Sequence, residues 1–354
     1  MFDSVLEKCE FSWTLNNEKN KELCDSIVVS HLRERFLSND VKDKLIVSLS
    51  GGVDSMVIAS CANFLGIKTI CVHINYNNRD ESVLEAEFLK QWCEQNQMFH
   101  FEYVNILNLK RGTLDRSQYE VETRKIRMKS YKSLMERFET KYVCLGHHDG
   151  DIVENVLMNI FKNRDLLDLT VMKELSATSA EEEVMLFRPL LGLFKASIFE
   201  FAHKYGVPYF KDTTPGWSVR GMLRTLLIPT LSRIFPRFEK ALMGISKQSD
   251  DWNQVIVQRV ISPFLDTNVT YSETDGRTIV TIDYHFYEDM PECFFCRVWT
   301  NIFHSMQHSM PSRKAMTELY LTMKKSEEKK MVLTPQVFAV KKKESQVLVI
   351  TIKH

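Results

Sequence analysis

Apolar strand-like runs and helix-like segments alternate through the first half of this 354-residue chain. Each run is short, and the segment after it carries apolar residues at helical spacing. The runs are 44–49, 69–74, 99–104 and 141–145, and the helical segments are 56–65, 83–95, about 118–138 and 152–161. This alternation is typical of a parallel sheet with helices on both faces, so the sequence predicts a Rossmann-like α/β fold.

The pattern changes after residue 224, where mainly helical sequence continues to about residue 263. Further elements are then expected: a hairpin at 269–284, helices at 291–307 and 312–324, and a closing hairpin in which 331–334 or 337–340 pairs with 347–352. A chain of this length suits two domains. We expect a lead-in and helix in 1–40, an α/β domain in 41–235 and a smaller, mainly helical domain with a β-hairpin in 236–354.

Composition excludes several classes of protein. Lys and Arg total 46 and so do Asp and Glu, which argues against a chain coated in basic charge. No run approaches the roughly 18 apolar residues of a membrane span, and the N-terminal residues resemble neither a signal nor a transit peptide. The eight cysteines are scattered, and two of them, Cys71 and Cys144, lie in apolar runs. We therefore expect no membrane association and a reducing, cytoplasmic location.

A glycine-rich loop joins the first predicted strand to the helix after it: Ser50-Gly51-Gly52-Val53-Asp54-Ser55. The glycines allow close backbone approach to a ligand, and the N–H groups and dipole of the following helix favour an anion. The two serines add hydroxyl donors. Asp54 has the same sign of charge as phosphate, so we expect it to hold Mg²⁺ or to orient the loop. The loop predicts an ATP phosphate site, and the alternative is an ordinary strand–turn–helix connection.

The loop has neither Walker nor dinucleotide-binding spacing, and it resembles the PP-loop of ATP pyrophosphatases. Those enzymes cleave ATP to AMP and pyrophosphate while adenylating a substrate. Over most of residues 40–240 the chain resembles the tRNA(Ile)-lysidine synthetase family. Further motifs carry the resemblance: Val72-His73-Ile74-Asn75-Tyr76-Asn77-Asn78-Arg79, Glu120-Val121-Glu122-Thr123-Arg124-Lys125-Ile126-Arg127, Gly146-His147-His148-Asp149-Gly150-Asp151-Ile152-Val153-Glu154-Asn155, Arg188-Pro189-Leu190-Leu191, and then Asp212, Arg220 and Arg224.

Asp151 and Glu154 stand three apart at the start of a predicted helix, so they share a face and can bind an ammonium group. The alternative is a pair that only stabilises the helix N-terminus. In the family this position resembles the site of the lysine acceptor. The histidines at 147 and 148 are either metal ligands or hydrogen-bonded core residues, and the sequence disfavours zinc.

The resemblance implies roles for the other motif residues. His73 would bind ATP together with the loop, and Arg124 and Arg220 would act in catalysis with Asp54 and the acidic pair. Arg127 and Arg224 would bind substrate, since guanidinium groups suit phosphates of ATP or RNA. For Arg124 and Arg127 the alternative is a solvated helix face.

Four departures from the family pattern mark a divergent member. Gly150 stands where the family has an Asp, and Lys162-Asn163-Arg164-Asp165 replaces a glycine-rich segment. Pro215 ends the segment that begins at Asp212, where the family has an Asn, and Gly221 replaces the Asn after Arg220.

The implied reaction adenylates carbon 2 of a tRNA wobble cytidine with ATP and Mg²⁺, and free lysine then displaces AMP. The expected partner is tRNA(Ile) with a CAU anticodon, held by the domain at 236–354, and a homodimer is a further expectation. One alternative is PP-loop tRNA thiolation, which commonly uses cysteine pairs. Here the single Cys-x-x-Cys, Cys293 to Cys296, fits core packing better. Another alternative is an RNA-binding protein with a relict ATP site.

Overall fold

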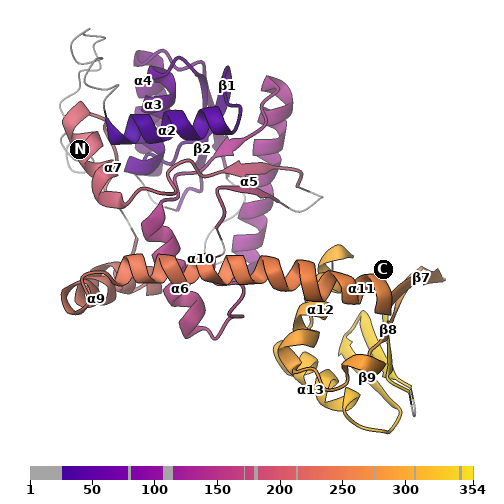
Figure 1. Cartoon of the computed structure of the whole chain (residues 1–354). Coiled ribbons are helices and arrows are strands. Elements are labelled where there is room, and N and C mark those ends of the chain that lie inside the picture. The colour runs from indigo at the N-terminus through magenta and orange to yellow at the C-terminus, as the bar shows by residue number, and fades with distance from the viewer. Residues whose placement is uncertain are drawn as a thin grey trace. The chain divides into compact units, whose positions relative to one another are not determined.

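The computed structural model in Figure 1 describes residues 26–78, 81–106, 115–170, 172–178, 182–212, 214–274, 276–306, 308–342 and 345–353. The lead-in expected before residue 26 lies outside these ranges. The chain divides into two compact units, Met1–Ser249 and Asp250–His354. The division falls within helix α10 (Phe238–Ile256), which is C-terminal to the boundary expected after residue 235.

The first unit is built on a six-stranded sheet with the order β3-β2-β1-β4-β6-β5. All neighbours are parallel except β5 and β6, which are antiparallel. The strands are β1 (Lys44–Ser48), β2 (Lys68–Asn75), β3 (His100–Asn105), β4 (Val143–Cys144), β5 (Leu175–Ala177) and β6 (Met185–Phe187). The predicted parallel α/β sheet is confirmed.

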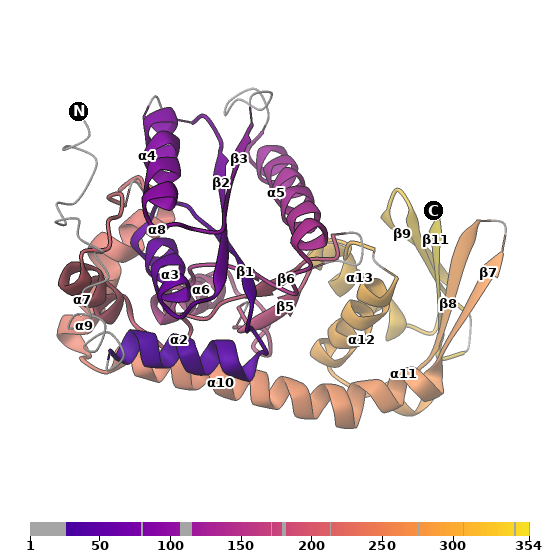
Figure 2. The ribbon, with the colours of Figure 1, turned by 90° about the horizontal axis from the view of Figure 1, so that it is seen from above.

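Helices cover both faces of this sheet, as Figure 2 shows. They are α2 (Ile27–Ser38), α3 (Val53–Phe64), α4 (Ser82–Gln95), α5 (Arg116–Phe138), α6 (Asp149–Phe161) and α7 (Lys195–Tyr205). One core contains Leu32 of α2, Met56 of α3, Trp92 of α4 and Phe201 of α7. On the other face, Tyr131 and its neighbours in α5 pack against apolar residues of β1, β2, β4 and β6. Burial of these faces is the main stabilising contribution, and it exposes the loops at the carboxyl ends of the strands.

A helical run closes the first unit. It consists of α8 (Val219–Met222), a π-helical turn η2 (Leu223–Leu227), α9 (Ile228–Ile234) and the first part of α10. Leu223 and Phe238 from this run pack against Val153 and Leu157 of α6. The run therefore fixes α6, the helix that carries the predicted acidic pair.

The second unit contains an antiparallel sheet of five strands in the order β7-β8-β11-β10-β9. Its elements are η3 (Val257–Ile261), α11 (Ser262–Asn268), β7 (Val269–Thr274), β8 (Arg277–Asp283), η4 (His285–Tyr287), α12 (Glu292–Ser305), α13 (Arg313–Met323), β9 (Lys329–Thr334), β10 (Val337–Lys341) and β11 (Val347–Lys353). Trp299 of α12 and Leu319 of α13 share a core with Ile350 of β11.

The sheet of the second unit corrects one expectation. The hairpin at 269–284 is confirmed as β7 and β8, with Gly276 in the left-handed region at a φ of 67°. In the closing segment β10 pairs with both β9 and β11, and β11 also pairs with β8. The expected separate hairpins are thus joined into one sheet, because the β8–β11 pairing links segments far apart in sequence. No helix among the described residues is long and apolar enough to cross a membrane.

Candidate active site

The glycine-rich loop folds around its own hydroxyl groups. The Oγ of Ser55 donates to the carbonyl of Gly52 at 3.0 Å and accepts the N–H of Ser50 at 3.2 Å. The N–H of Gly52 donates to the Oγ of Ser50 at 3.3 Å. Helix α3 begins at Val53, so the loop presents the first N–H groups of a buried helix at a strand end. This geometry favours an anionic ligand.

Two glycines allow other segments to approach this loop. Gly51 has a φ of 82°, and a side chain there would overlap the ring of Phe210. The N–H of Phe210 also donates to the carbonyl of Gly51 at 2.8 Å. A Cβ atom at Gly146, after β4, would lie 2.8 Å from the Cβ of Asp54. The loops after β1 and β4 and the segment at 210 are therefore packed into one surface.

Asp54 lies in the first turn of α3 and meets Lys195 from the first turn of α7. The Nζ of Lys195 donates to Oδ2 of Asp54 at 2.6 Å. The other oxygen, Oδ1, is buried and has no hydrogen-bond partner among the described residues. Mg²⁺ at nucleotide sites is commonly held by one or two carboxylates together with phosphates, so this oxygen fits such an ion. No cluster of three or more His, Cys, Asp or Glu that could hold a metal alone occurs in the described ranges.

The two histidines after β4 have different partners. The Nδ1 of His148 accepts the N–H of Gly150 at 3.0 Å and caps α6, while the N–H of His148 donates to Oδ2 of Asp151 at 3.0 Å. Its Nε2 therefore carries the proton and lies 3.6 Å from Oδ2 of Asp151 and 4.0 Å from Oδ1 of Asp54. The two histidines are therefore hydrogen-bonded residues rather than metal ligands.

His147 accepts a hydrogen bond from the Nε of Arg188 at 3.2 Å. Burial lowers the pKa of His147 to about 4; the Asp151 charge acts in the opposite direction, and the Arg188 charge reinforces the shift. This ring is therefore neutral near pH 7.

Gly150 makes room for the His148 ring. A Cβ atom at Gly150 would lie 2.7 Å from Cε1 and 3.0 Å from Nδ1 of that ring. Both distances are shorter than ordinary van der Waals contact. The departure from the family pattern at Gly150 is thus coupled to the way His148 caps the helix.

The predicted acidic pair surrounds the guanidinium of Arg224. Its Nε donates to Oε1 of Glu154 at 2.5 Å, and its Nη2 lies 3.5 Å from Oδ1 of Asp151. Its Nη1 donates to Oδ2 of Asp212 at 2.7 Å. Arg224 lies in the π-helical turn, a geometry that is often found at functional sites. Two carboxylates from α6 and one from the segment at 212 therefore share one guanidinium.

The charges of this cluster reinforce one another. Burial of Arg224 opposes its charge, yet the hydrogen bond and charge of Glu154, with the Asp212 and Asp151 charges, raise its pKa. For Asp212, burial acts to raise the pKa, but hydrogen bonds from Thr214 and the Arg224 charge hold it below the usual value. Three carboxylates face Arg224, and Arg220 lies 3.8 Å from Glu154, so the formal charges leave one negative charge in excess, which can attract a further cation.

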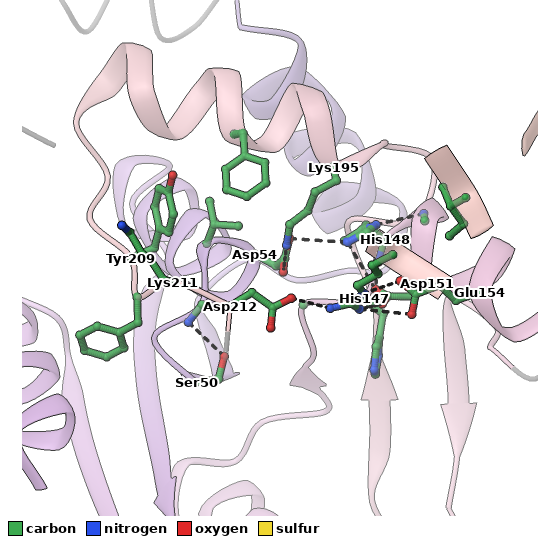
Figure 3. Close-up of a pocket in the computed structure, with 18 of the residues that line it drawn as sticks. Ser50, Asp54, His147, His148, Asp151, Glu154, Lys195, Tyr209, Lys211 and Asp212 are labelled. Atoms are coloured by element: carbon green, nitrogen blue, oxygen red, sulfur yellow. Dashed lines mark hydrogen bonds and ion pairs between the residues drawn. The ribbon is translucent and has the colours of Figure 1, made fainter. Parts of the chain in front are cut away.

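One pocket of about 650 Å³ joins the loop to this cluster. Figure 3 shows Ser50 and Asp54 on one side, Asp151 and Glu154 on the other, and His148 between them. A volume of this size is typical of a small-molecule site. The lining side chains come from the loop, the carboxylate cluster, the segment at 209–212 and the surrounding helices: Ser50, Val53, Asp54, Glu85, His147, His148, Asp151, Glu154, Lys195, Phe199, Tyr209, Phe210, Lys211, Asp212, Arg224, Ile228 and Glu239.

Outside the glycine-rich loop, four predicted site residues do not line this pocket. His73 donates from Nδ1 to the carbonyl of Leu49 at 2.8 Å beneath the loop, and burial lowers its pKa. Arg220 is half exposed, with its Nε 3.8 Å from Oε2 of Glu154. Arg124 pairs with Glu182 through two hydrogen bonds, of 3.1 and 2.8 Å. Arg127 is half-buried on the same helix, α5, and Arg79 lies outside the described residues.

Lys195 and Lys211 were not predicted from sequence. Lys195 begins a helix three residues after Gly192, and only the three-dimensional packing of α7 against α3 brings it to Asp54. Lys211 directly precedes Asp212, a residue of the family motif. This position in the sequence was the one signal that could have identified Lys211 as a site residue.

Comparison with known proteins supports the resemblance to PP-loop proteins that the sequence motifs indicate. Residues 25–231 match the model of the PP-loop domain. This chain belongs to the PP-loop family. Within it, the chain is a divergent relative of the tRNA(Ile)-lysidine synthases. It is 30% identical to the tRNA(Ile)-lysidine synthase of Chlamydia muridarum over 234 residues, which are 65% of this chain and 70% of that relative.

Other PP-loop relatives are longer. The tRNA(Ile)-lysidine synthase of Protochlamydia amoebophila is 30% identical over 241 residues, which are 66% of this chain and 51% of the relative. That of Enterococcus faecalis is 26% identical over 231 residues, 64% of this chain and 48% of the relative. The match thus spans about half the length of these two proteins.

A solved structure shares the PP-loop fold. The U34-tRNA thiolase of Methanococcus maripaludis, with its [4Fe-4S] cluster, aligns with a TM-score of 0.50 and 18% identity over 64% of this chain and 78% of that chain. A likeness at this identity concerns the fold alone.

Proposed function

We propose that this protein uses ATP to modify tRNA in two steps: adenylation of carbon 2 of a wobble cytidine, then displacement of AMP by lysine to form lysidine. The observation that supports this proposal most directly is that the phosphate loop and the Arg224 carboxylate cluster line one pocket. An activating nucleotide and a cationic acceptor can then meet without leaving the site. Relatives named as tRNA(Ile)-lysidine synthases support the choice of lysidine and of tRNA(Ile), and the CAU anticodon is included in the proposal.

In the first step, the oxygen on carbon 2 of the cytidine attacks the α-phosphorus of ATP, and pyrophosphate leaves. The N–H groups of the loop and the ammonium of Lys195 stabilise charge on the phosphates. Mg²⁺, when bound, supplies further positive charge, and Asp54 would hold it through its buried Oδ1. His73 supports the loop from below through Leu49, which is a positioning role.

In the second step, a carboxylate of the acidic pair takes a proton from the ε-ammonium of lysine, the neutral ε-amine attacks carbon 2, and AMP leaves with the electrons of the broken C–O bond. Asp151 and Glu154 bind and orient the cationic amino acid. Arg224 holds these carboxylates in place through hydrogen bonds of 2.5 to 3.5 Å. His148 lies between the phosphate side and the acceptor side, with its Nε2 4.0 Å from Oδ1 of Asp54 and 3.6 Å from Oδ2 of Asp151, so it can position both carboxylates.

Binding of the whole tRNA involves surfaces beyond this pocket. We include in the proposal the second unit as a tRNA-binding domain, a homodimeric state and a cytoplasmic location. Arg124, Arg127 and Arg220 are assigned to the RNA rather than to ATP, since none of them lines the pocket.

Thiolation has less support from the cysteines. Cys61, Cys71, Cys93 and Cys144 are buried, as expected for the two in apolar runs. The core packing expected for the Cys-x-x-Cys pair holds only for Cys296, which is half-buried against the core of the second unit; Cys293 is exposed on α12. No second Cys-x-x-Cys pair accompanies them in the sequence.

One experiment separates the candidate functions. The full chain is incubated with ATP, Mg²⁺, labelled lysine and total tRNA, and pyrophosphate release and nucleoside mass are measured. Release of pyrophosphate with a lysine-bearing cytidine supports the proposal. A sulfur-bearing nucleoside formed with a sulfide donor would instead establish thiolation, and tight tRNA binding without pyrophosphate release would indicate a relict ATP site.

A further inference from the structure

The outward face of the α8–η2–α9 run exposes apolar side chains at helical spacing. Val219, Met222 and Leu226 are 60%, 43% and 63% exposed. The inward face of the same run already supplies its packing, through Leu223 and the half-buried side chains beside it. The outward residues therefore add nothing to the core, and an apolar stripe of this kind marks an interaction surface.

An exposed tryptophan lies at the start of this stripe. Trp217 is 79% exposed. Its loop is nevertheless held firmly: Ser218 donates from both N–H and Oγ to the carbonyl of Pro215, at 2.9 and 2.7 Å. A side chain at Gly221 would overlap that carbonyl, so the departures at Pro215 and Gly221 pack directly together. The indole is thus presented on a fixed backbone, which lowers the entropy cost of binding.

The same segment carries excess positive charge. Residues 217–240 contain five basic residues and one acidic residue, a net charge of +4 in a chain whose formal net charge is zero. Arg224 is neutralised by the carboxylate cluster. Arg233, Arg237 and Lys240 are exposed and form no ion pair within the described parts of the chain. Their charge is available to an anionic partner.

The combination selects one kind of occupant. A polyanion with exposed aromatic rings, such as unpaired RNA, satisfies both the basic side chains and the indole. A symmetric contact between two copies through this face would place the same arginines against each other, which is unfavourable. The run also contains Arg224 and follows Asp212, both of which line the pocket, so RNA bound along it leads into the site.

We propose that the face from Trp217 to Arg237 binds single-stranded RNA beside the pocket, with an unpaired base stacked on Trp217. The proposal rests on the proposed function in that the RNA is the substrate. It assigns to Trp217 a part in choosing a looped RNA over a duplex.

The test uses the full chain and two synthetic RNAs of equal length: a hairpin whose loop carries CAU and a 2-aminopurine beside it, and a fully paired duplex. Trp217→Ala should weaken hairpin binding about tenfold or more, the usual effect of losing one stacking partner. Trp217→Phe should retain most of the affinity. Quenching of 2-aminopurine should occur with the wild type and the Phe variant and be lost with Ala, while duplex binding changes little.

Phe99→Ala serves as the matched control, because Phe99 is also an exposed aromatic residue, at 48%, and lies in the first unit just before β3, outside the pocket. Arg233→Ala and Arg237→Ala should each reduce the salt dependence of hairpin binding. Equal losses from Trp217→Ala and Phe99→Ala would overturn the proposal. So would unchanged hairpin affinity and quenching in Trp217→Ala, or dimerisation of the wild type that Trp217→Ala abolishes without any change in RNA binding.

Two further measurements complete the design. Vesicles containing phosphatidylserine are tested in parallel; Trp217-dependent binding to vesicles but not to the hairpin would overturn RNA as the partner. Lysine incorporation is measured separately. If hairpin binding depends on Trp217 but no lysine is incorporated, the RNA-binding surface is supported and lysidine formation is excluded. If Trp217→Ala incorporates lysine normally and its hairpin binding is unchanged, only the RNA-binding surface is excluded.

Discussion

The ammonium of Lys195 lies 2.6 Å from Oδ2 of Asp54, so the acidic residue of the phosphate loop is paired with a cation from a different helix. This pairing resolves the difficulty of a carboxylate beside phosphate. One oxygen is neutralised by Lys195, and the other, buried and unpartnered in the described structure, remains for a metal ion. Lys195 thus contributes to phosphate binding both by its own charge and by setting the direction of Asp54.

Replacing Lys195 with Met should lower pyrophosphate release. Charge-assisted hydrogen bonds contribute about 1.5–3 kcal/mol, so the expected fall in kcat/KM for ATP is roughly tenfold to a hundredfold. Lys195→Arg should retain more activity than Met. Lys204→Met, on the same helix but outside the pocket, is the control, and a loss of equal size there would contradict a specific role for Lys195.

Asp151→Asn should separate the two proposed steps. The amide oxygen can still accept the N–H of His148, so the cap of α6 is retained while the negative charge is lost. Adenylated tRNA should accumulate, and lysine incorporation should fall by about a hundredfold or more. Rapid-quench analysis of labelled AMP–tRNA measures this. Asp149→Asn is the control because Asp149 faces Gly192 instead of the pocket, and an unchanged rate in Asp151→Asn would exclude the acceptor role.

Gly150→Ala should destabilise the protein through a clash with the His148 ring. Overpacking of this kind costs about 1–3 kcal/mol. The double variant His148→Ser with Gly150→Ala should recover much of the loss, since Ser also caps helices and removes the ring. Thermal unfolding of the four proteins in this cycle gives the coupling. Strictly additive effects would mean that the two positions are independent.

Acidification should destabilise the folded protein through His147. Its pKa is about 4 in the folded state, below the ordinary value of 6.5, so the unfolded chain binds a proton first as pH falls. The stabilising effect of the neutral ring is complete above pH 6.5 and is lost as pH falls toward 4, by at most about 3 kcal/mol. Urea unfolding across this range should show a shallower decline for His147→Gln. If the wild type and His147→Gln lose stability in parallel as pH falls, His147 is not the cause of the acid destabilisation.

The strand–helix alternation was sufficient to predict the first unit because each strand of a parallel sheet is buried on both faces and reads as a continuous apolar run. The phosphate loop was equally readable, since Gly51 and Gly52 serve a backbone geometry that few other residues allow. Asp151 and Glu154 share a face of α6, as their spacing indicated, but their contact with Arg224 was not predicted, because Arg224 was expected to bind phosphate.

Long-range side-chain contacts were not readable in the same way. Arg124 looked available for phosphate, yet its partner Glu182 comes from a segment about sixty positions later, and no local pattern reveals that pair. The five-stranded sheet of the second unit was missed for a related reason. The β8–β11 pairing depends on tertiary packing that half-buried alternating strands do not specify alone.

Phe210 and Asp212 are two residues apart, and each is tied to a different half of the pocket. The N–H of Phe210 donates a hydrogen bond to the carbonyl of Gly51 in the phosphate loop. Oδ2 of Asp212 accepts a hydrogen bond from Arg224 of the carboxylate cluster. The short stretch of backbone at 210–212 is therefore one route by which a displacement of the loop on nucleotide binding reaches the acceptor cluster. Binding of ATP is therefore expected to change the affinity for the cationic acceptor, and the reverse. The residues at 210–212 would then determine the order in which the two substrates bind.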